Sequence, residues 1–323
     1  MSQLVGIIYF LFPLIIASMV PLALVALGGL YSERSGVINI ALEGIMVMGG
    51  FLGIMTMRFL EQTTAMPLQL IAATGLLVGA IAGCIFSVAH AYASINMKAN
   101  QIISATALNL FAPALAVFVA RTIFLSRRIV ISGNYLIREV PILSDIPVIG
   151  NLFFTRAYLS TYIGAALFII LTFVLYKTRL GLRLRACGEN PHAADSVGVN
   201  IYRMRYTGVL VSGALAGMGG VIFVLSFATR FDGTVIGFGF LALAVMISGQ
   251  WHPRKLLYAA FFFAMMRVIA ATYSGLPILA DIPVPSQIYR MLPYVATLAV
   301  LAFTSKNSRA PRAIGEPYDA GKR

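Results

Sequence analysis

Two apolar stretches of the chain contain polar side chains of the kinds that bind solutes or hold helices together. Asn39 and Glu43 lie four residues apart in "SGVINIALEGIMVMGG", so they project from one face of a helix. A carboxylate in hydrocarbon costs about 2.5–3.5 kcal/mol on insertion scales, and it usually faces a protein interior or an aqueous path. Two roles for Glu43 follow: it lines such a path, or it is structural and pairs with Arg34 or a neighbouring helix.

A second polar set follows in "QIISATALN", where Gln101, Ser104 and Asn109 are spaced three and five residues apart. Only Gln101 and Ser104 clearly share a helical face. Hydrogen bonding between helices explains this set about as well as contact with a solute does. Asn39, Glu43, Gln101, Ser104 and Asn109 together form the candidate lining of a path.

A polar segment, "LRLRACGENPHAADSVGVN", interrupts the apolar chain at residues 182–200. Asn190 is a good helix N-cap, Pro191 suits the first helical position, and Gly198 can close the helix. The pattern predicts a short helix of about two turns over residues 191–197, flanked by Arg-rich chain. This helix is too short and too polar to span a membrane. It is either a connecting loop or a docking surface for another protein.

Several common catalytic and binding motifs are absent from the sequence. There is no G-x-x-x-x-G-K-[ST], no G-x-S-x-G and no H-E-x-x-H. His90 and His252 have no Cys or His partner at metal-ligand spacing, and the two cysteines form no disulfide framework. We therefore expect no metal site, no enzyme activity and no cofactor bound by this chain.

The elements that carry these residues are long and apolar. Of the 323 residues, 59% are hydrophobic and 11% are charged, against about 25% charged in an ordinary soluble domain. This composition predicts an all-α polytopic membrane protein. Nine segments approach the ~20 residues that a helix needs to cross ~30 Å of hydrocarbon, the shortest being 235–249. They are 5–30, 37–57, 68–95, 102–120, 158–176, 206–228, 235–249, 256–273 and 288–303.

Basic residues predict the orientation. The loop 177–205, the link "WHPRK" and the tail 305–323 are rich in Lys and Arg, as cytoplasmic segments are. Counting back from them puts the N-terminus outside and the C-terminus inside. The loop 121–157 disagrees, because it is basic yet falls outside; a re-entrant piece near "IPVIGNLFF" would make a tenth segment. Basic loops also account for the net charge of +13 without a nucleic-acid partner.

The two halves of the chain contain a weak internal repeat. "SGVINIALEGIMVMGG" and "DGTVIGFGFLALAVMISGQ" both lead from Gly and polar residues into an apolar segment, and they enter the membrane from opposite sides. Inverted repeats of this kind commonly build a transport path near the membrane midplane. Gly213, Gly217 and Gly220 form a small-residue run that predicts close helix packing.

Four stretches carry a resemblance to a known family. They are "TRLGLRLRACGENPHAADSVGVNIYRMR", "ALGGLYSERSGVINIALEGIMVMGGFLG", "KANQIISATALNLFAPAL" and "RAPRAIGEPYDAGKR". The first is similar to the cytoplasmic coupling segment of ATP-binding-cassette importer permeases in the branched-chain amino acid and simple-sugar branch. Together they most resemble the shorter permease subunit of bacterial nucleoside importers, from about residue 22 to residue 318.

The resemblance implies a role for the polar segment, which would sit in a cleft of a separate ATPase subunit and transmit its movement. Most of the family's pattern is present, whereas His192 stands where the family more often has Arg. The expected ATPase-coupling residues are Gly188, Glu189, Asn190, Pro191, His192, Ala193, Ala194 and Gly198. The path residues could then hydrogen-bond a ribose or a base.

The resemblance also implies the assembly and its place in the cell. We expect a transmembrane permease domain over residues 1–304, with the coupling loop 177–205, and a basic cytoplasmic tail over 305–323. The partners would be ATPase subunits that use the ATP, a second similar permease, an external substrate-binding lipoprotein and the bilayer of the bacterial inner membrane.

Other functions remain open on sequence grounds. The cargo could be a simple sugar or a branched-chain amino acid instead of a nucleoside. An ion-coupled secondary transporter would need intramembrane acidic or His residues, and Glu43 is the only strong one. A membrane enzyme acting on lipid would need clustered His, Asp or Glu at a membrane face, and the sequence contains none.

Overall fold

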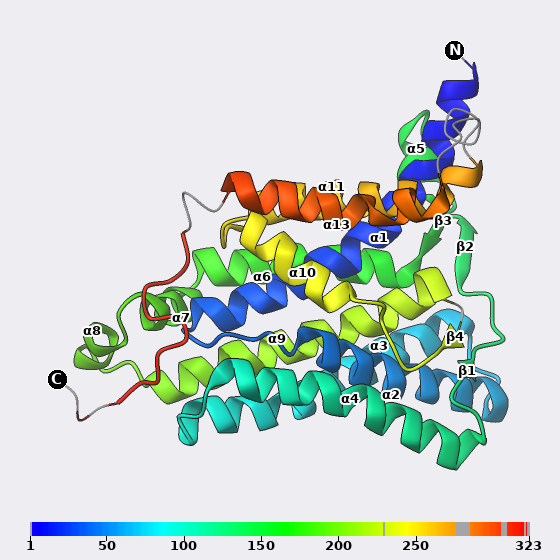
Figure 1. Ribbon diagram of the computed structural model, residues 1–323. Coiled ribbons are helices and arrows are strands. Elements are labelled where there is room, and N and C mark those ends of the chain that lie inside the picture. Colours follow the sequence, from blue (N-terminus) through cyan, green and yellow to red (C-terminus); the bar gives the residue numbers. More distant parts are fainter. Residues whose placement is uncertain (1, 229, 276–284, 305–308, 320, 322–323) are drawn as a thin grey trace.

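Apolar segments in lipid can satisfy their backbone polar groups only within helices or closed barrels. The computed structural model is accordingly a helical bundle with a few short strands (Figure 1). It describes residues 2–228, 230–275, 285–304, 309–319 and 321. Residues 305–308, 320, 322 and 323 of the expected tail lie outside the described residues.

Seven helices in the described residues are long and apolar enough to cross a membrane. The π-helical turns η1 (Tyr92–Asn96) and η2 (Val224–Ala228) extend two of them. The seven are α1 (Ser2–Arg34), α2 (Leu42–Thr63), α3 (Leu68–Ala91), α4 (Gln101–Phe124), α6 (Leu159–Lys177), α9 (Ile201–Phe223) and α11 (Pro253–Thr272).

Two further apolar segments predicted from the sequence are also helical. They form α10 (Phe238–Ser248), which has only 11 residues, and α13 (Ser286–Thr304). Neither is among the seven helices that meet the length and hydropathy criteria of a span. The count of nine spans therefore stays a prediction.

The remaining elements lie near the two ends of the bundle. The strands pair antiparallel, β1 with β4 and β2 with β3. They are β1 (Ile129–Val130), β2 (Leu136–Glu139), β3 (Thr155–Tyr158) and β4 (Arg230–Phe231), and the short helices are α5 (Ile149–Phe153), α7 (Arg179–Glu189), α8 (Pro191–Ser196) and η3 (Tyr273–Gly275).

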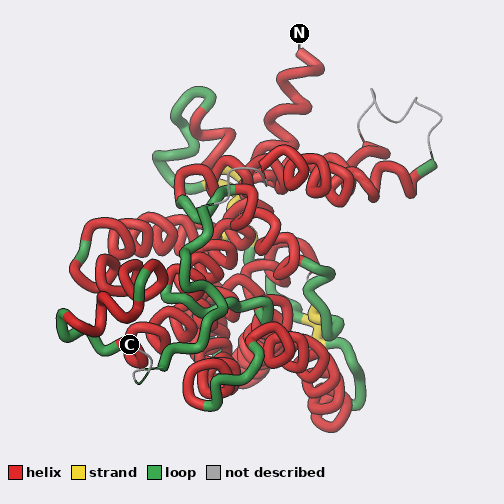
Figure 2. Tube along the Cα trace, turned by 60° about the vertical axis from the view of Figure 1, so that its left-hand side comes forward, coloured by secondary structure: helices red, strands yellow, loops and turns green. Residues whose placement is uncertain are grey.

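The two ends of the molecule carry different elements. Figure 1 shows α7, α8 and the C-terminus at one end, and the N-terminus, α5 and the strands at the other. Figure 2 shows the first turns of α1 projecting beyond the rest of the bundle. The basic loop 121–157, whose side was in doubt, thus lies at the end opposite to α7 and α8.

Helices α2, α3 and α9 pack closely against one another along glycines. A Cβ at Gly217 of α9 would overlap the carbonyl oxygen of Gly79 in α3, and one at Gly213 would overlap Ser87. A Cβ at Gly220 would overlap the carbonyl oxygen of Met46 in α2. The close packing predicted for the glycine run of α9 is confirmed.

Candidate functional site

Residues 36–41 between α1 and α2 are not helical, although Val37, Asn39 and Ala41 are fully buried. Backbone groups at such a position need internal partners, because lipid offers none. Gly36, with φ of +96°, turns the chain out of α1. We refer to residues 36–41 as the unwound segment.

Side chains from α3 and α4 satisfy the backbone of the unwound segment at Ile38. The Ile38 N–H donates to Gln101 Oε1 at 2.7 Å, and its carbonyl oxygen lies 2.8 Å from His90 Nε2. A carbonyl oxygen only accepts, so Nε2 of His90 carries the proton and Nδ1 accepts from the Ser104 hydroxyl, 3.1 Å away. Gln101 and His90 thus bind the backbone of Ile38 directly, and Ser104 binds it through His90.

Asn109 and Asn39 satisfy the end of the unwound segment. Asn109 Nδ2 donates to the Ile40 carbonyl at 2.9 Å, and its Oδ1 accepts from the Gly44 N–H at 2.7 Å. Asn39 Nδ2 donates to the Ser212 hydroxyl of α9 at 2.9 Å. The sequence analysis did not single out His90 or Ser212 for this work, because their partners are more than 50 residues away along the chain.

Glu43 joins the N-termini of two helices. It lies in the first turn of α2, and its two carboxylate oxygens accept from the N–H groups of Gly237 at 2.8 Å and Gly239 at 2.7 Å, at the start of α10. A carboxylate is favourable at a helix N-terminus, where unpaired N–H groups carry partial positive charge. Arg34, the other partner considered for Glu43, instead forms an ion pair with Glu189 at 3.2 Å.

The five candidate path residues therefore fall into two groups in the structure. Gln101, Ser104 and Asn109 lie around the unwound segment, to which Asn39 itself belongs, and Glu43 binds the start of α10. Asn39 is fully buried and Gln101 is 3% exposed, so neither meets solvent in this conformation. Their role in transport stays a prediction, and their structural contacts are with the polypeptide backbone and neighbouring side chains.

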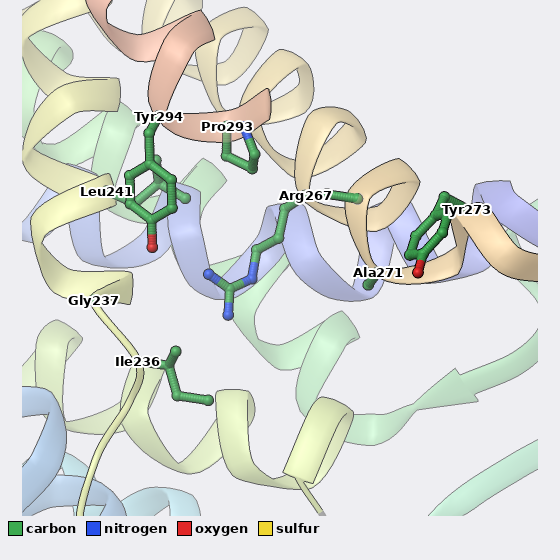
Figure 3. Close-up of a pocket in the computed structure, with 9 residues that line it drawn as sticks. Ile236, Gly237, Leu241, Arg267, Ala271, Tyr273, Pro293 and Tyr294 are labelled. Carbon is green, nitrogen blue, oxygen red and sulfur yellow. The ribbon is translucent and has the colours of Figure 1, made fainter. Parts of the chain in front are cut away.

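A cavity of about 300 Å³ lies beside the start of α10. Figure 3 shows the Arg267 side chain of α11 extending into it, with Tyr294 of α13 and Tyr273 on its two sides. Ile236 and Gly237, which immediately precede α10, line the cavity as well. The sequence analysis placed no functional residue here, although a lone Arg in an apolar segment was a signal that could have found the site.

The end of α1 connects this interior to the end of the bundle that carries α7 and α8. The buried Glu33 carboxylate accepts a hydrogen bond from Trp251 Nε1. Arg34 donates to the Trp251 carbonyl at 2.8 Å and pairs with Glu189 of α7. His252, next to Trp251, has its pKa lowered by burial and by nearby cations that include Arg254.

The predicted short helix is present as α8. The Asn190 side chain accepts from the Ala193 N–H at 3.0 Å, Pro191 occupies the first turn, and Gly198 has φ of +81°. The local prediction is confirmed. The Arg-rich flank that precedes it is also helical and forms α7, which the sequence analysis did not predict.

The eight expected coupling residues point in two directions. Gly188, Pro191 and Ala194 are buried against the bundle. The outward set is exposed and comprises Glu189, Asn190, His192, Ala193 and Gly198. Val197, which was not among the eight, is 76% exposed on the same short segment. The outward set and Val197 are therefore on the surface of the segment.

The C-terminal tail packs onto this end of the bundle. The Ala313 N–H donates to the Gly188 carbonyl at 2.9 Å, and the Gly315 N–H donates to the Gly36 carbonyl at 3.1 Å. Lys98 and Asp319 form an ion pair at 3.4 Å, and the Tyr318 ring lies 5.3 Å from the His192 ring. The tail thus connects the segment that carries α7 and α8 to the start of the unwound segment.

Arg205 of α9 is 1% exposed and binds the tail from inside the bundle. Its guanidinium donates to the Glu316 carbonyl at 2.8 Å. A Cβ at Gly36 would lie 3.1 Å from the same guanidinium, so glycine gives Arg205 its room. The sequence analysis counted Arg205 only as one of the charges that set the orientation.

Comparison with known proteins identifies the class. Residues 12–301 match the family described as "Branched-chain amino acid transport system / permease component". The chain belongs to this family, whose members are the membrane permeases of ATP-driven importers.

Individual relatives match nearly the whole chain. The nucleoside ABC transporter permease protein NupC of Lactococcus lactis is 40% identical over 303 residues, which are 94% of each chain. The guanosine ABC transporter permease protein NupQ of Bacillus subtilis is 38% identical and covers 99% of this chain and 100% of its own. A Haloferax volcanii protein proposed to be a glucose ABC transporter permease, TsgC13, is 30% identical over 87% of each chain.

Proposed function

We propose that this chain is the membrane-spanning permease subunit of an ATP-driven importer whose cargo is a nucleoside. The observation that carries the proposal is the full-length similarity to permeases named for nucleosides and for guanosine. The absence of a P-loop motif in the sequence supports a separate ATPase subunit. A second similar permease and an external binding lipoprotein complete the assembly.

The proposed topology has nine crossings, with the N-terminus outside and the C-terminus in the cytoplasm of a bacterium. The positions of the two termini at opposite ends of the bundle support an odd number of crossings. The segment 235–249 makes one of them, although only residues 238–248 of it are helical. Short, interrupted helices of this kind are typical of transport paths.

The proposed coupling surface is α8 with the exposed residues beside it. ATP-driven closure of the ATPase subunits would move α8, and two contacts would carry that movement inward. One contact is the Arg34–Glu189 ion pair, and the other is the tail between Gly188 and Gly36. Both lead to the unwound segment, and through α2 to Glu43 at the start of α10.

Uptake by the reconstituted complex tests this function. Proteoliposomes would contain both permeases, the ATPase and the loaded binding lipoprotein, with labelled guanosine, adenosine, leucine or glucose as cargo. We expect ATP-dependent accumulation of nucleosides and not of leucine or glucose. Uptake of leucine or glucose alone would assign the cargo to another branch of the family. Accumulation driven by an ion gradient without the ATPase would support a secondary transporter.

A further inference from the structure

Arg267 places a positive charge in the third quarter of the apolar helix α11. Charged side chains within a span are costly and usually face a protein interior or a water-filled path. The guanidinium carbon of Arg267 lies over the ring of Phe238 at 4.5 Å and 5.9 Å from the ring centre of Phe223. Both rings are buried, so they form a rigid backing for the guanidinium.

Stacking on a ring occupies the face of a guanidinium and leaves the N–H groups at its edge to donate in plane. Within the described part of the chain, no hydrogen-bond acceptor pairs with these groups. They extend instead into the cavity of about 300 Å³ between α10, α11 and α13 (Figure 3). An Arg held against aromatic rings, with donors that no described acceptor uses, is arranged to receive a ligand that offers two adjacent acceptors.

The residues that line the cavity and their net charge indicate which class of ligand it can bind. Tyr273 and Tyr294 provide aromatic surface, and Leu241, Ala271 and Pro293 provide apolar surface. A volume of about 300 Å³ is at the lower end for small-molecule sites. Glu43 interacts electrostatically with Arg267, so its carboxylate offsets part of the positive charge at the cavity. The site therefore suits a neutral, planar, aromatic ligand better than an anion.

We infer that this cavity is a cargo site on the translocation path and that Arg267 binds the O6 and N7 edge of a 6-oxopurine nucleoside. Arg donates two hydrogen bonds to these acceptors, whereas adenine presents a donor at the N6 position. Tyrosine faces stack on bases of either kind. The inference rests on the proposed nucleoside import and adds the residue that distinguishes guanosine or inosine from adenosine within the membrane.

The test is uptake by the reconstituted complex carrying Arg267→Gln. Gln pairs with the N6 and N7 edge of adenine, so we expect the guanosine-to-adenosine uptake ratio to fall by at least about fivefold, the low end of the range for a bidentate contact. The same binding lipoprotein serves wild type and variant, so its own preference cancels in the comparison. Arg267→Lys keeps the positive charge but lacks the paired N–H donors of a guanidinium, so it should give an intermediate guanosine-to-adenosine uptake ratio.

Arg58→Gln is the matched control, because Arg58 also lies over a ring, that of Phe124 at 5.0 Å, but lines none of the described cavities. The guanosine-to-adenosine uptake ratio of the Arg58→Gln variant should equal that of wild type. If wild type takes up nucleosides and Arg267→Gln leaves the ratio unchanged, the inference is wrong and the proposed function stands. If the variant instead loses the second permease on purification with an unchanged ratio, Arg267 serves assembly and the inference is also overturned. If wild type takes up no nucleoside, both fail.

A measurement with intact Arg267 covers the case in which its variants do not fold. Ala271 lines the cavity and is exposed, so a cysteine in its place, in a C84A/C187A background, should react with a small methanethiosulfonate. Guanosine delivered by the binding lipoprotein during ATP turnover should slow this reaction, and adenosine should slow it less. Equal rates with and without guanosine would overturn the inference.

Discussion

At the scale of single residues, the polar side chains buried in this bundle mainly bind backbone. Gln101, Asn109 and His90 bind the unwound segment, and Glu43 binds the start of α10. The reason is physical: wherever a span is not helical, its N–H and C=O groups must find partners inside the protein. Such side chains stabilise the interruptions in the helices.

Glu43 provides the sharpest test of this arrangement. Glu43→Gln removes one of the two acceptor oxygens from the start of α10, and Glu43→Ala removes both. Each buried N–H left without a partner costs about 1–3 kcal/mol. We expect the melting temperature of the purified complex to fall from wild type to Gln to Ala, and uptake to fall with it while the ATPase subunit still co-purifies.

The exposed Glu139 is the control for this series, because Glu139→Ala removes a carboxylate that no buried N–H group depends on. We expect Glu139→Ala to melt like wild type, within about 0.5 kcal/mol. Unchanged melting and uptake in Glu43→Ala would show that the contact with α10 is unimportant.

Cys187 offers a test by pH. Burial raises the pKa of its thiol from 9.0 to about 11, and the thiolate is the reactive form. At pH 8 about one thiol in 1000 is then ionised, against about one in ten for a pKa of 9. In a C84A background we expect Cys187 to react with maleimide at least about 100-fold more slowly than a cysteine at exposed Ala193.

The sign of the pH effect on stability follows from the same pKa. The folded protein keeps the Cys187 proton at a pH where the unfolded chain has lost it, so this contribution to stability is complete below pH 9.0 and declines as the pH approaches about 11. A Cys187 that reacts at pH 8 as fast as the Ala193 cysteine would contradict the burial on which this rests.

At the scale of elements, the sequence predicts what local chemistry determines. Asn190, Pro191 and Gly198 predict α8 because capping acts over a few residues. The unwound segment could not be predicted, since its partners lie on α3, α4 and α9, far away along the chain. The same applies to the cavity beside Arg267, which forms only where α10, α11 and α13 meet.

Asn190 caps α8 and is exposed, so its substitution leaves the buried contacts of the bundle in place. Asn190→Ala deletes the acceptor for the Ala193 N–H and should weaken the start of α8 by about 1 kcal/mol, whereas Asn190→Asp keeps a cap. We expect the Ala variant, and more strongly Asn190→Ala with Pro191→Ala, to hydrolyse ATP in the complex with reduced uptake per ATP. Uptake per ATP equal to wild type in the double variant would rule out α8 as the coupling element.

The tail makes a second prediction for the end of the bundle that carries α7 and α8. Deleting residues 309–323 removes the donors to Gly188 and Gly36 and leaves the buried Arg205 without its acceptor. We expect a lower melting temperature and loss of uptake, because an unpaired buried charge is strongly destabilising. Arg205→Met in the truncated chain should recover much of the stability, since it replaces that charge with an apolar side chain, but not the uptake.

A shorter deletion, of residues 320–323, is the control for the tail, because it keeps the contacts of Ala313, Gly315 and Glu316. It should retain both stability and uptake. Full uptake by the chain without residues 309–323 would show that the tail is dispensable for coupling.

At the scale of the whole molecule, the two ends of the bundle carry different elements. Helices α7 and α8 and the tail lie at one end and the strands at the other, and between them Glu43, just after the unwound segment, binds the start of α10. Close glycine contacts pack α2, α3 and α9 against one another. In the proposed coupling, movement of α8 would reach the interior through the Arg34–Glu189 ion pair and the tail contacts, without separating α2, α3 and α9.

The orientation of this arrangement in the membrane is the last prediction. Asn134 is exposed at the end that carries the strands, and Val197 is exposed beside α8 at the opposite end. With a cysteine at either position in a C84A/C187A background, an impermeant thiol reagent added to intact cells should label position 134 and not position 197. Permeabilised cells should show labelling at both positions. The basic loop 177–205 favours this orientation, whereas the basic loop 121–157 opposes it. Labelling of position 197 alone in intact cells would invert the molecule and place α8 where no ATPase can reach it.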